Sequence, residues 1–187
     1  KRHHLRRLLK EGQRDVESMA VVERKGLFWS QALEIERQAY WSQFSLGSIS
    51  GAALQILSHQ VDHHQDMINK GQATPPKHRI PDNNLWMKNF KRVMNRLGIG
   101  ITNRMDRNYH LLRGQAIAAR HVLDQLEQIE LVDENTFANI RRTYMSYCYV
   151  AIKNLENMRN RFPAIVTSIE NKLAQRLILN AEKKELI

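Results

Sequence analysis

Residues 109–126 read YHLLRGQAIAARHVLDQL, and their apolar side chains recur at alternating steps of three and four residues. This spacing is typical of one face of an α-helix. The face consists of Tyr109, Leu112, Ala116, Ala119, Leu123 and Leu126. The same alternation resumes beyond residues 131–134 with Phe137, Ile140, Tyr144, Tyr147, Ala151, Leu155 and Met158. A short turn would join these two long helices, and Asp133 would cap the second one. This arrangement predicts an antiparallel pair.

Eight residues define the seam that this pair would form, either within one chain or between two copies. They are Tyr109, Leu112, Ala116, Leu123, Leu126, Phe137, Tyr144 and Leu155.

The region before this pair predicts a helical hairpin. Its first helix would begin near Asp15, end at Gly47 and bury Phe28, Ala32, Ile35, Ala39 and Tyr40. Ser50 has the side chain of an N-cap, and Ile49 before it fits a hydrophobic staple. The second helix would bury Leu54, Leu57, Val61 and Ile68. A short turn between them predicts that the two helices fold back on each other.

The remaining segments complete an all-α prediction. Residues 71–83 contain three prolines and a glycine, which helix cannot cross, so they predict a linker. A helix with Trp86, Phe90, Val93 and Leu97 on one face should follow, and Pro163 should begin a last helix with Ile165, Ile169, Leu173 and Leu177. We therefore expect a helical hairpin plus an antiparallel bundle of about five to six helices. The expected parts are a basic arm (1–14), the hairpin (15–70), the linker (71–83) and a bundle (84–187) leading towards a downstream module.

The charge of the 187-residue chain is concentrated at two places. Its formal net charge is +10, from 29 Lys and Arg against 19 Asp and Glu. One basic zone is the arm, with Lys1, Arg2, Arg6, Arg7 and Lys10, and the other covers residues 70–107. Such zones attract the phosphates of nucleic acid or of anionic lipid, or simply solvate a surface. The single cysteine, Cys148, fits a reducing compartment, and as part of a helical seam it predicts an inert thiol.

Candidate chemistry is sparse. His59, His63 and Asp66 are spaced to share one helix face and could hold a metal ion or sense pH, although a solvated polar face is the simpler interpretation. The glutamate of an HExxH protease is missing, and we find no glycine-rich phosphate loop and no carboxylate couple. The sequence therefore predicts neither an enzyme nor a cofactor.

Two further patterns leave alternatives open. The bases from Lys88 to Arg96, beside Trp86 and Phe90, are compatible with a helical nucleic-acid-binding domain, but no zinc-finger or RNP signature accompanies them. The aromatic group Trp29, Tyr40, Trp41 and Phe44 could form an exposed docking patch. Because Tyr40 and Phe44 share a helix face, we expect this group in the hairpin core instead.

Residues 36–62 carry a more specific pattern, E-R-x-x-Y-W-x-x-F-x-x-G-x-I-S-x-x-A-L followed by V-D. Its members here are Glu36, Arg37, Tyr40, Trp41, Phe44, Gly47, Ile49, Ser50, Val61 and Asp62. The stretch resembles the soluble region after the membrane domain of sodium/proton antiporters of the NhaP type, the plant salt-overly-sensitive type and the sperm type. Phe162 and Pro163, within RFPAIV, are similar to the helix that precedes the cyclic-nucleotide-binding-like module in such tails.

The resemblance implies a cytosolic regulatory and dimerisation domain of a monovalent cation/proton antiporter. Its partners would be the membrane domain of the same antiporter, a second copy and anionic lipid headgroups, rather than nucleic acid. It would lie on the cytoplasmic side of the plasma or cell membrane, as part of an integral membrane protein. The basic arm fits that position, because bases concentrate just cytoplasmic of a last membrane helix. The opening at Lys1 without a methionine also suggests a fragment of a longer protein.

Overall fold

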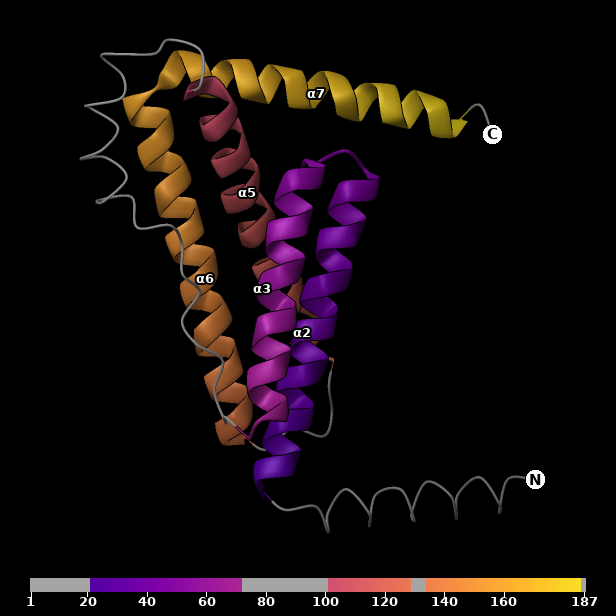
Figure 1. The fold of residues 1–187 in the computed structure, drawn as a ribbon, viewed down its shortest axis with the longest axis vertical. Coiled ribbons are helices and arrows are strands. Elements are labelled where there is room, and N and C mark those ends of the chain that lie inside the picture. The colour runs from indigo at the N-terminus through magenta and orange to yellow at the C-terminus, as the bar shows by residue number, and fades with distance from the viewer. Residues whose placement is uncertain (1–20, 72–100, 129–133, 186–187) are drawn as a thin grey trace.

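Five helices account for most of the described part of the chain, and no strand occurs in it, which confirms the all-α prediction. The computed structural model describes residues 21–71, 101–128 and 134–185. The helices are α2 (Val21–Ser45), α3 (Gly51–Asn69), α5 (Ile101–Leu126), α6 (Glu134–Arg161) and α7 (Pro163–Glu185). Helices α2, α3, α5 and α6 run roughly alongside one another, and α7 lies across one end of them (Figure 1). None of the helices in these ranges is both long and apolar enough to cross a bilayer.

The hairpin of α2 and α3 forms at the residues that the sequence indicates. Gly47 adopts a φ of 76°, a conformation that side-chain-bearing residues rarely adopt, and its amide donates to the carbonyl of Phe44 over 2.8 Å. Ser50 caps α3, because its side chain accepts a hydrogen bond of 3.3 Å from the amide of Ala53. Ile49 is buried beside it. The predicted turn chemistry is therefore confirmed.

Helices α5 and α6 form the predicted antiparallel pair (Figure 1). Helix α5 also contacts α2, α3 and α7, so it lies at the centre of the bundle. For this reason it buries Leu111, Ala118 and Val122 in addition to the predicted face. The connection at residues 129–133, with the expected cap Asp133, lies outside the described residues.

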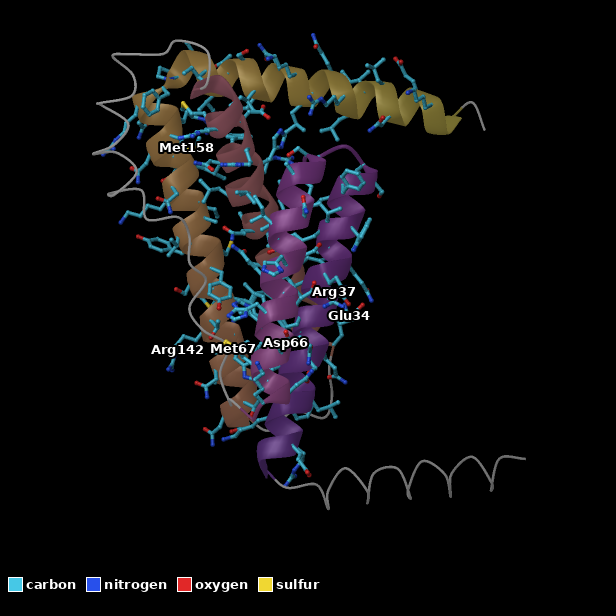
Figure 2. All side chains as sticks on the ribbon, in the orientation of Figure 1. Glu34, Arg37, Asp66, Met67, Arg142 and Met158 are labelled. Atoms are coloured by element: carbon cyan, nitrogen blue, oxygen red, sulfur yellow. The ribbon has the colours of Figure 1, made fainter. Side chains whose placement is uncertain are left out.

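One apolar core joins the hairpin to the later helices. The main cluster draws residues from α2, α3, α5 and α6, so these helices pack as one unit. A second cluster holds α7 through Val166, Ile169 and Leu173 against Tyr109. Met158, near the end of α6, packs against this second cluster and lies close to the α7 junction (Figure 2). The start near residue 15, most of the 71–83 linker and the helix expected around Trp86 lie outside the described residues.

The predicted seam lies inside a single chain. Tyr109, Leu112, Leu126 and Tyr144 are buried, and Ala116, Leu123, Phe137 and Leu155 are half-buried. Cys148 is also half-buried and packs against the main core. The periodicity thus identified a covered face correctly, and the chain itself covers it.

The aromatic group of α2 divides between the core and the surface. Trp29 and Tyr40 are buried, as expected, but Trp41 is 54% exposed and Phe44 is 40% exposed. The core prediction is wrong for these two residues. Trp41 follows Tyr40 and therefore points about 100° away from the buried face. Phe44 reaches only the start of α3, near Gly51, and meets Trp41 edge to face.

Candidate functional site

A carboxylate lies buried where α2 meets α6. Glu36 is 1% exposed, and its two oxygens accept hydrogen bonds from two tyrosines. Tyr40 donates to Oε1 over 2.6 Å from the same helix, and Tyr144 donates to Oε2 over 2.8 Å from α6. Burial, reinforced by the Glu36 carboxylate, raises the pKa of both tyrosines well above the ordinary value, so both hydroxyls remain donors. This network ties the hairpin to the α5–α6 pair.

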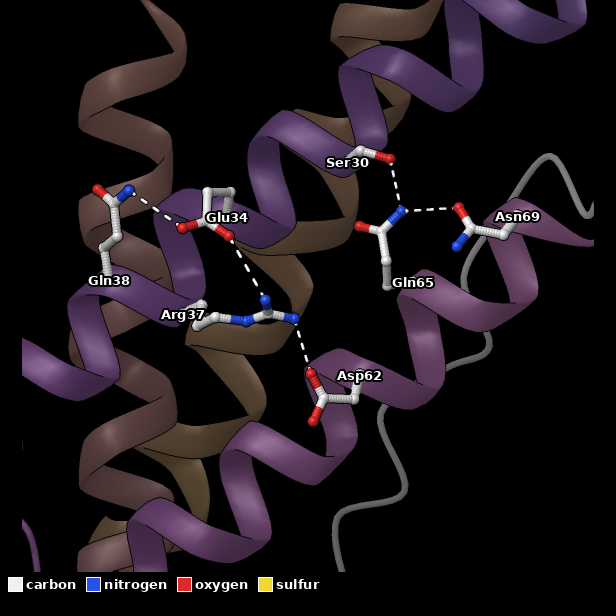
Figure 3. A network of polar contacts seen from close by, with 7 residues as sticks. All are labelled: Ser30, Glu34, Arg37, Gln38, Asp62, Gln65 and Asn69. Carbon is white, nitrogen blue, oxygen red and sulfur yellow. Dashed lines mark hydrogen bonds and ion pairs between the residues drawn. The ribbon is translucent and has the colours of Figure 1, made fainter.

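Polar contacts on the outer side of the hairpin align α2 with α3 (Figure 3). Arg37 contacts Asp62 over 2.7 Å and Glu34 over 3.6 Å, and Gln65 donates to the Ser30 hydroxyl over 2.7 Å. Exposed ion pairs of this kind contribute roughly 0–1 kcal/mol each. Their main effect is therefore on the register of the two helices.

Most members of the 36–62 pattern build the hairpin. Beyond Glu36–Tyr40 and Arg37–Asp62, Gly47 and Ser50 make the turn, and Val61 is fully buried. Trp41 and Phe44 are the exceptions, because both are exposed. Pro163 is the first residue of α7, as predicted, and the amide of Phe162 still donates to the carbonyl of Met158 over 2.9 Å.

The histidine-rich part of α3 does not assemble a metal centre among the described residues. His59, His63 and Asp66 are all exposed, and no group of three or more His, Cys, Asp or Glu in the described ranges could hold a metal ion. The neighbouring Asp62 is engaged by Arg37, and His64 is buried. The bases Lys1, Arg2, Arg6, Arg7 and Lys10 lie outside the described residues.

A second polar junction binds the α2–α3 turn to α5. Arg113 donates to the carbonyl of Ser48 over 3.1 Å and also contacts its hydroxyl. Gln43 donates to the carbonyl of Gly114 over 3.2 Å. His110 is 1% exposed at this junction, and its Nε2 lies 3.8 Å from Oδ1 of Asp106. Burial lowers the pKa of His110, and the nearby Asp106 opposes that effect in part.

Polar contacts fasten helix α7 to the bundle at two points along its length. Tyr109 and Arg159 both donate to Oε1 of Glu170, over 3.0 and 2.6 Å. The Arg159 guanidinium lowers the pKa of Glu170, and burial together with Glu170 raises the pKa of Tyr109 to about 12. Asn180 donates to the carbonyl of Leu46 over 3.1 Å, so the far part of α7 reaches the hairpin turn. The hairpin, α5, α6 and α7 are therefore connected in a closed set of contacts.

We expect the buried His110 to make the stability of the fold depend on pH. Because burial lowers its folded pKa below the ordinary 6.5, the unfolded chain binds more protons as the pH falls through 6.5. We expect the free energy of unfolding to be retained above the unfolded pKa of about 6.5 and to decrease as the pH falls through that value towards the lower folded pKa. Urea unfolding at several pH values measures this change.

The matched variants are His110→Gln and His121→Gln, because His121 is exposed on the same helix. His110→Gln should flatten the pH dependence, whereas His121→Gln should leave it as in the unmodified chain. Equal pH profiles for the two variants would rule out this role of His110.

Comparison of the sequence with protein-family models and with curated proteins gives no match. Two polar junctions, one around Glu36 and one around Ser48 and His110, join helices that are distant in sequence. These contacts hold the relative positions of the helices.

Proposed function

We propose that this chain is a cytosolic regulatory and dimerisation domain of a monovalent cation/proton antiporter. The observation that carries the proposal is that residues 36–62, which resemble antiporter tails, form one helical hairpin. The pattern that resembles antiporter tails coincides with one structural unit, in which Glu36 bonds Tyr40 and Arg37 pairs with Asp62.

Helix α2 is the element through which a signal would pass. It follows the basic arm in the chain, and each base near an anionic membrane surface contributes about 1 kcal/mol of attraction. Its buried Glu36 holds Tyr144 of α6, so a shift of α2 must either carry α6 along or break a buried hydrogen bond. Either outcome couples the position of the arm to the α5–α6 pair and biases the antiporter between more and less active states.

The first test is the coding sequence directly upstream, which should encode a hydrophobic region of several membrane spans. The full protein in membrane vesicles should then collapse an imposed pH gradient when sodium or another monovalent cation is added. Tyr144→Phe removes one hydroxyl from the coupling network without a large cavity, and we expect it to change the rate of exchange several-fold. Ser146→Ala, at an exposed position of α6, is the matched control and should behave as the unmodified protein.

Other outcomes would contradict the proposal. A native polypeptide with no membrane-spanning region on either side would exclude an antiporter. Binding to duplex DNA with a steep salt dependence would favour a nucleic-acid-binding domain instead. A thermal shift with zinc that His59→Ala combined with His63→Ala abolishes would favour a metal sensor.

A further inference from the structure

The outward side of α6 carries a stripe of large apolar side chains. Met145 is 53% exposed, Tyr149 is 64% exposed and Ile152 is 44% exposed. Their spacing of four and three residues places them on one face of the helix. Helix α6 buries a different face, with Ile140, Tyr144 and Ala151, against the rest of the bundle.

Charged residues of opposite sign end this stripe. Arg142 precedes it and Glu156 follows it, and each is seven residues from Tyr149. Both are exposed, and Figure 2 shows Arg142 on the side of α6 that is turned away from α2 and α3. The face 142–156 therefore runs from a positive end, through an apolar centre, to a negative end.

Such a face is complementary to itself when two copies meet in antiparallel orientation. In an antiparallel pair related by a two-fold axis at Tyr149, a residue before Tyr149 faces the residue equally far after it in the second copy. Arg142 of each copy then faces Glu156 of the other, and the two tyrosines meet at the axis. In a parallel pair Arg142 would instead oppose Arg142, and Glu156 would oppose Glu156, which repel.

The remaining charge on this face agrees with the same arrangement. Lys153 faces Met145 of the second copy, one helical turn from the level at which Arg142 of that copy faces Glu156, so the directly facing charges are of opposite sign. The ammonium of Lys153 lies 5.8 Å from the centre of the Tyr149 ring, and its aliphatic stem can cover apolar surface while the charge stays in water. Charge complementarity and the apolar centre therefore select one occupant, a second copy of this chain.

We propose that the outward face of α6, residues 142–156, is the surface through which two copies associate, as an antiparallel pair around Tyr149. The inference deepens the dimerisation within the proposed function, and it rests on that function for its biological purpose. It also moves the contact away from the seam of Tyr109 to Leu155, which the chain covers by itself. A contact along one helix lies at the small end of specific interfaces, so a weak dimer is expected.

Sedimentation equilibrium of the full chain at increasing concentration tests the proposal. The apparent mass should rise from the monomer mass of 21.9 kDa towards twice that value. Tyr149→Asp should keep the chain monomeric at every concentration while its circular dichroism and unfolding stay unchanged, because the side chain is exposed. Arg120→Ala, at an exposed position of α5, is the control and should dimerise normally.

A charge exchange tests the orientation. Arg142→Glu should weaken dimerisation about tenfold or more, since it places like charges opposite each other. Combining Arg142→Glu with Glu156→Arg should restore dimerisation, because opposite charges then face each other again with their positions exchanged.

A chain that is monomeric at every concentration would overturn the proposal and leave this face to another segment or another protein. A dimer that survives Tyr149→Asp would also overturn it. A chain that stays monomeric would also remove dimerisation from the proposed function, whereas the antiporter assignment and the regulatory coupling are tested separately by the upstream coding sequence and the transport assay.

Discussion

Replacing Glu36 with alanine should lower the free energy of unfolding by about 3 kcal/mol. The substitution leaves the buried hydroxyls of Tyr40 and Tyr144 without the carboxylate that accepts from both. Each lost hydrogen bond costs about 0.5–1.5 kcal/mol, and a buried donor left unsatisfied costs about 1–3 kcal/mol more. Urea unfolding followed by circular dichroism measures the loss directly.

Controls separate the network from a general effect on α2. Glu34→Ala changes an exposed glutamate of the same helix and should alter the free energy of unfolding by less than about 0.5 kcal/mol. Tyr144→Phe alone should cost about 1 kcal/mol, and in the Glu36→Ala background it should cost little or even stabilise. If Glu36→Ala were no worse than Glu34→Ala, the buried network would not hold α2 to α6.

The sequence predicted the helices well because helical periodicity is local. The faces around Leu57, Leu112 and Ile140 are each defined by residues within one helix, and the structure buries them. The turn at Gly47 and the cap at Ser50 are equally local. These features depend only on neighbours in sequence, so a single chain is enough to predict them.

The buried polar groups were missed because their burial depends on distant partners. Glu36 and Tyr144 are separated by 108 residues in the sequence. A glutamate next to an arginine, here Arg37, is typical of an exposed position, so the sequence alone does not indicate that Glu36 is buried. A signal was present, since Ala32, Glu36 and Tyr40 follow one another at steps of four along the apolar face of α2. His110 likewise lies between the apolar residues Tyr109 and Leu111.

Periodicity also does not reveal what covers an apolar face. The seam of α5 and α6 could have joined two chains, and the structure shows that one chain covers it. Conversely, the stripe of Met145, Tyr149 and Ile152 is exposed although it lies on the same long helix as that seam. Only the positions of the neighbouring helices distinguish the two faces.

Leu57→Ala should lower the free energy of unfolding by about 3 kcal/mol, within the range known for buried leucines. Leu57 is fully buried in α3 and fills the space that Gly114 leaves on α5. A Cβ added at Gly114 would lie 3.0 Å from Cδ1 of Leu57 and 3.3 Å from Cγ2 of Ile49. The two helices approach closely at this point, so truncating Leu57 opens a cavity between them. Urea unfolding measures the cost, and Leu46→Ala at an exposed position should change little.

The close contact between Leu57 and Gly114 predicts that Gly114→Ala changes the free energy of unfolding differently in the unmodified chain and in the Leu57→Ala chain. Alanine at Gly114 favours the helix by about 1 kcal/mol, but beside Leu57 its methyl group is crowded and the gain should vanish or become a loss. In the Leu57→Ala chain the nearest neighbour is gone and only Cγ2 of Ile49, 3.3 Å from the added Cβ, has to shift by a few tenths of an ångström, so Gly114→Ala should restore part of the lost stability. Gly26→Ala, whose Cβ would make ordinary contact with Ile68, should have the same effect in both backgrounds. Equal effects of Gly114→Ala in the two backgrounds would mean that α3 and α5 do not meet through these residues.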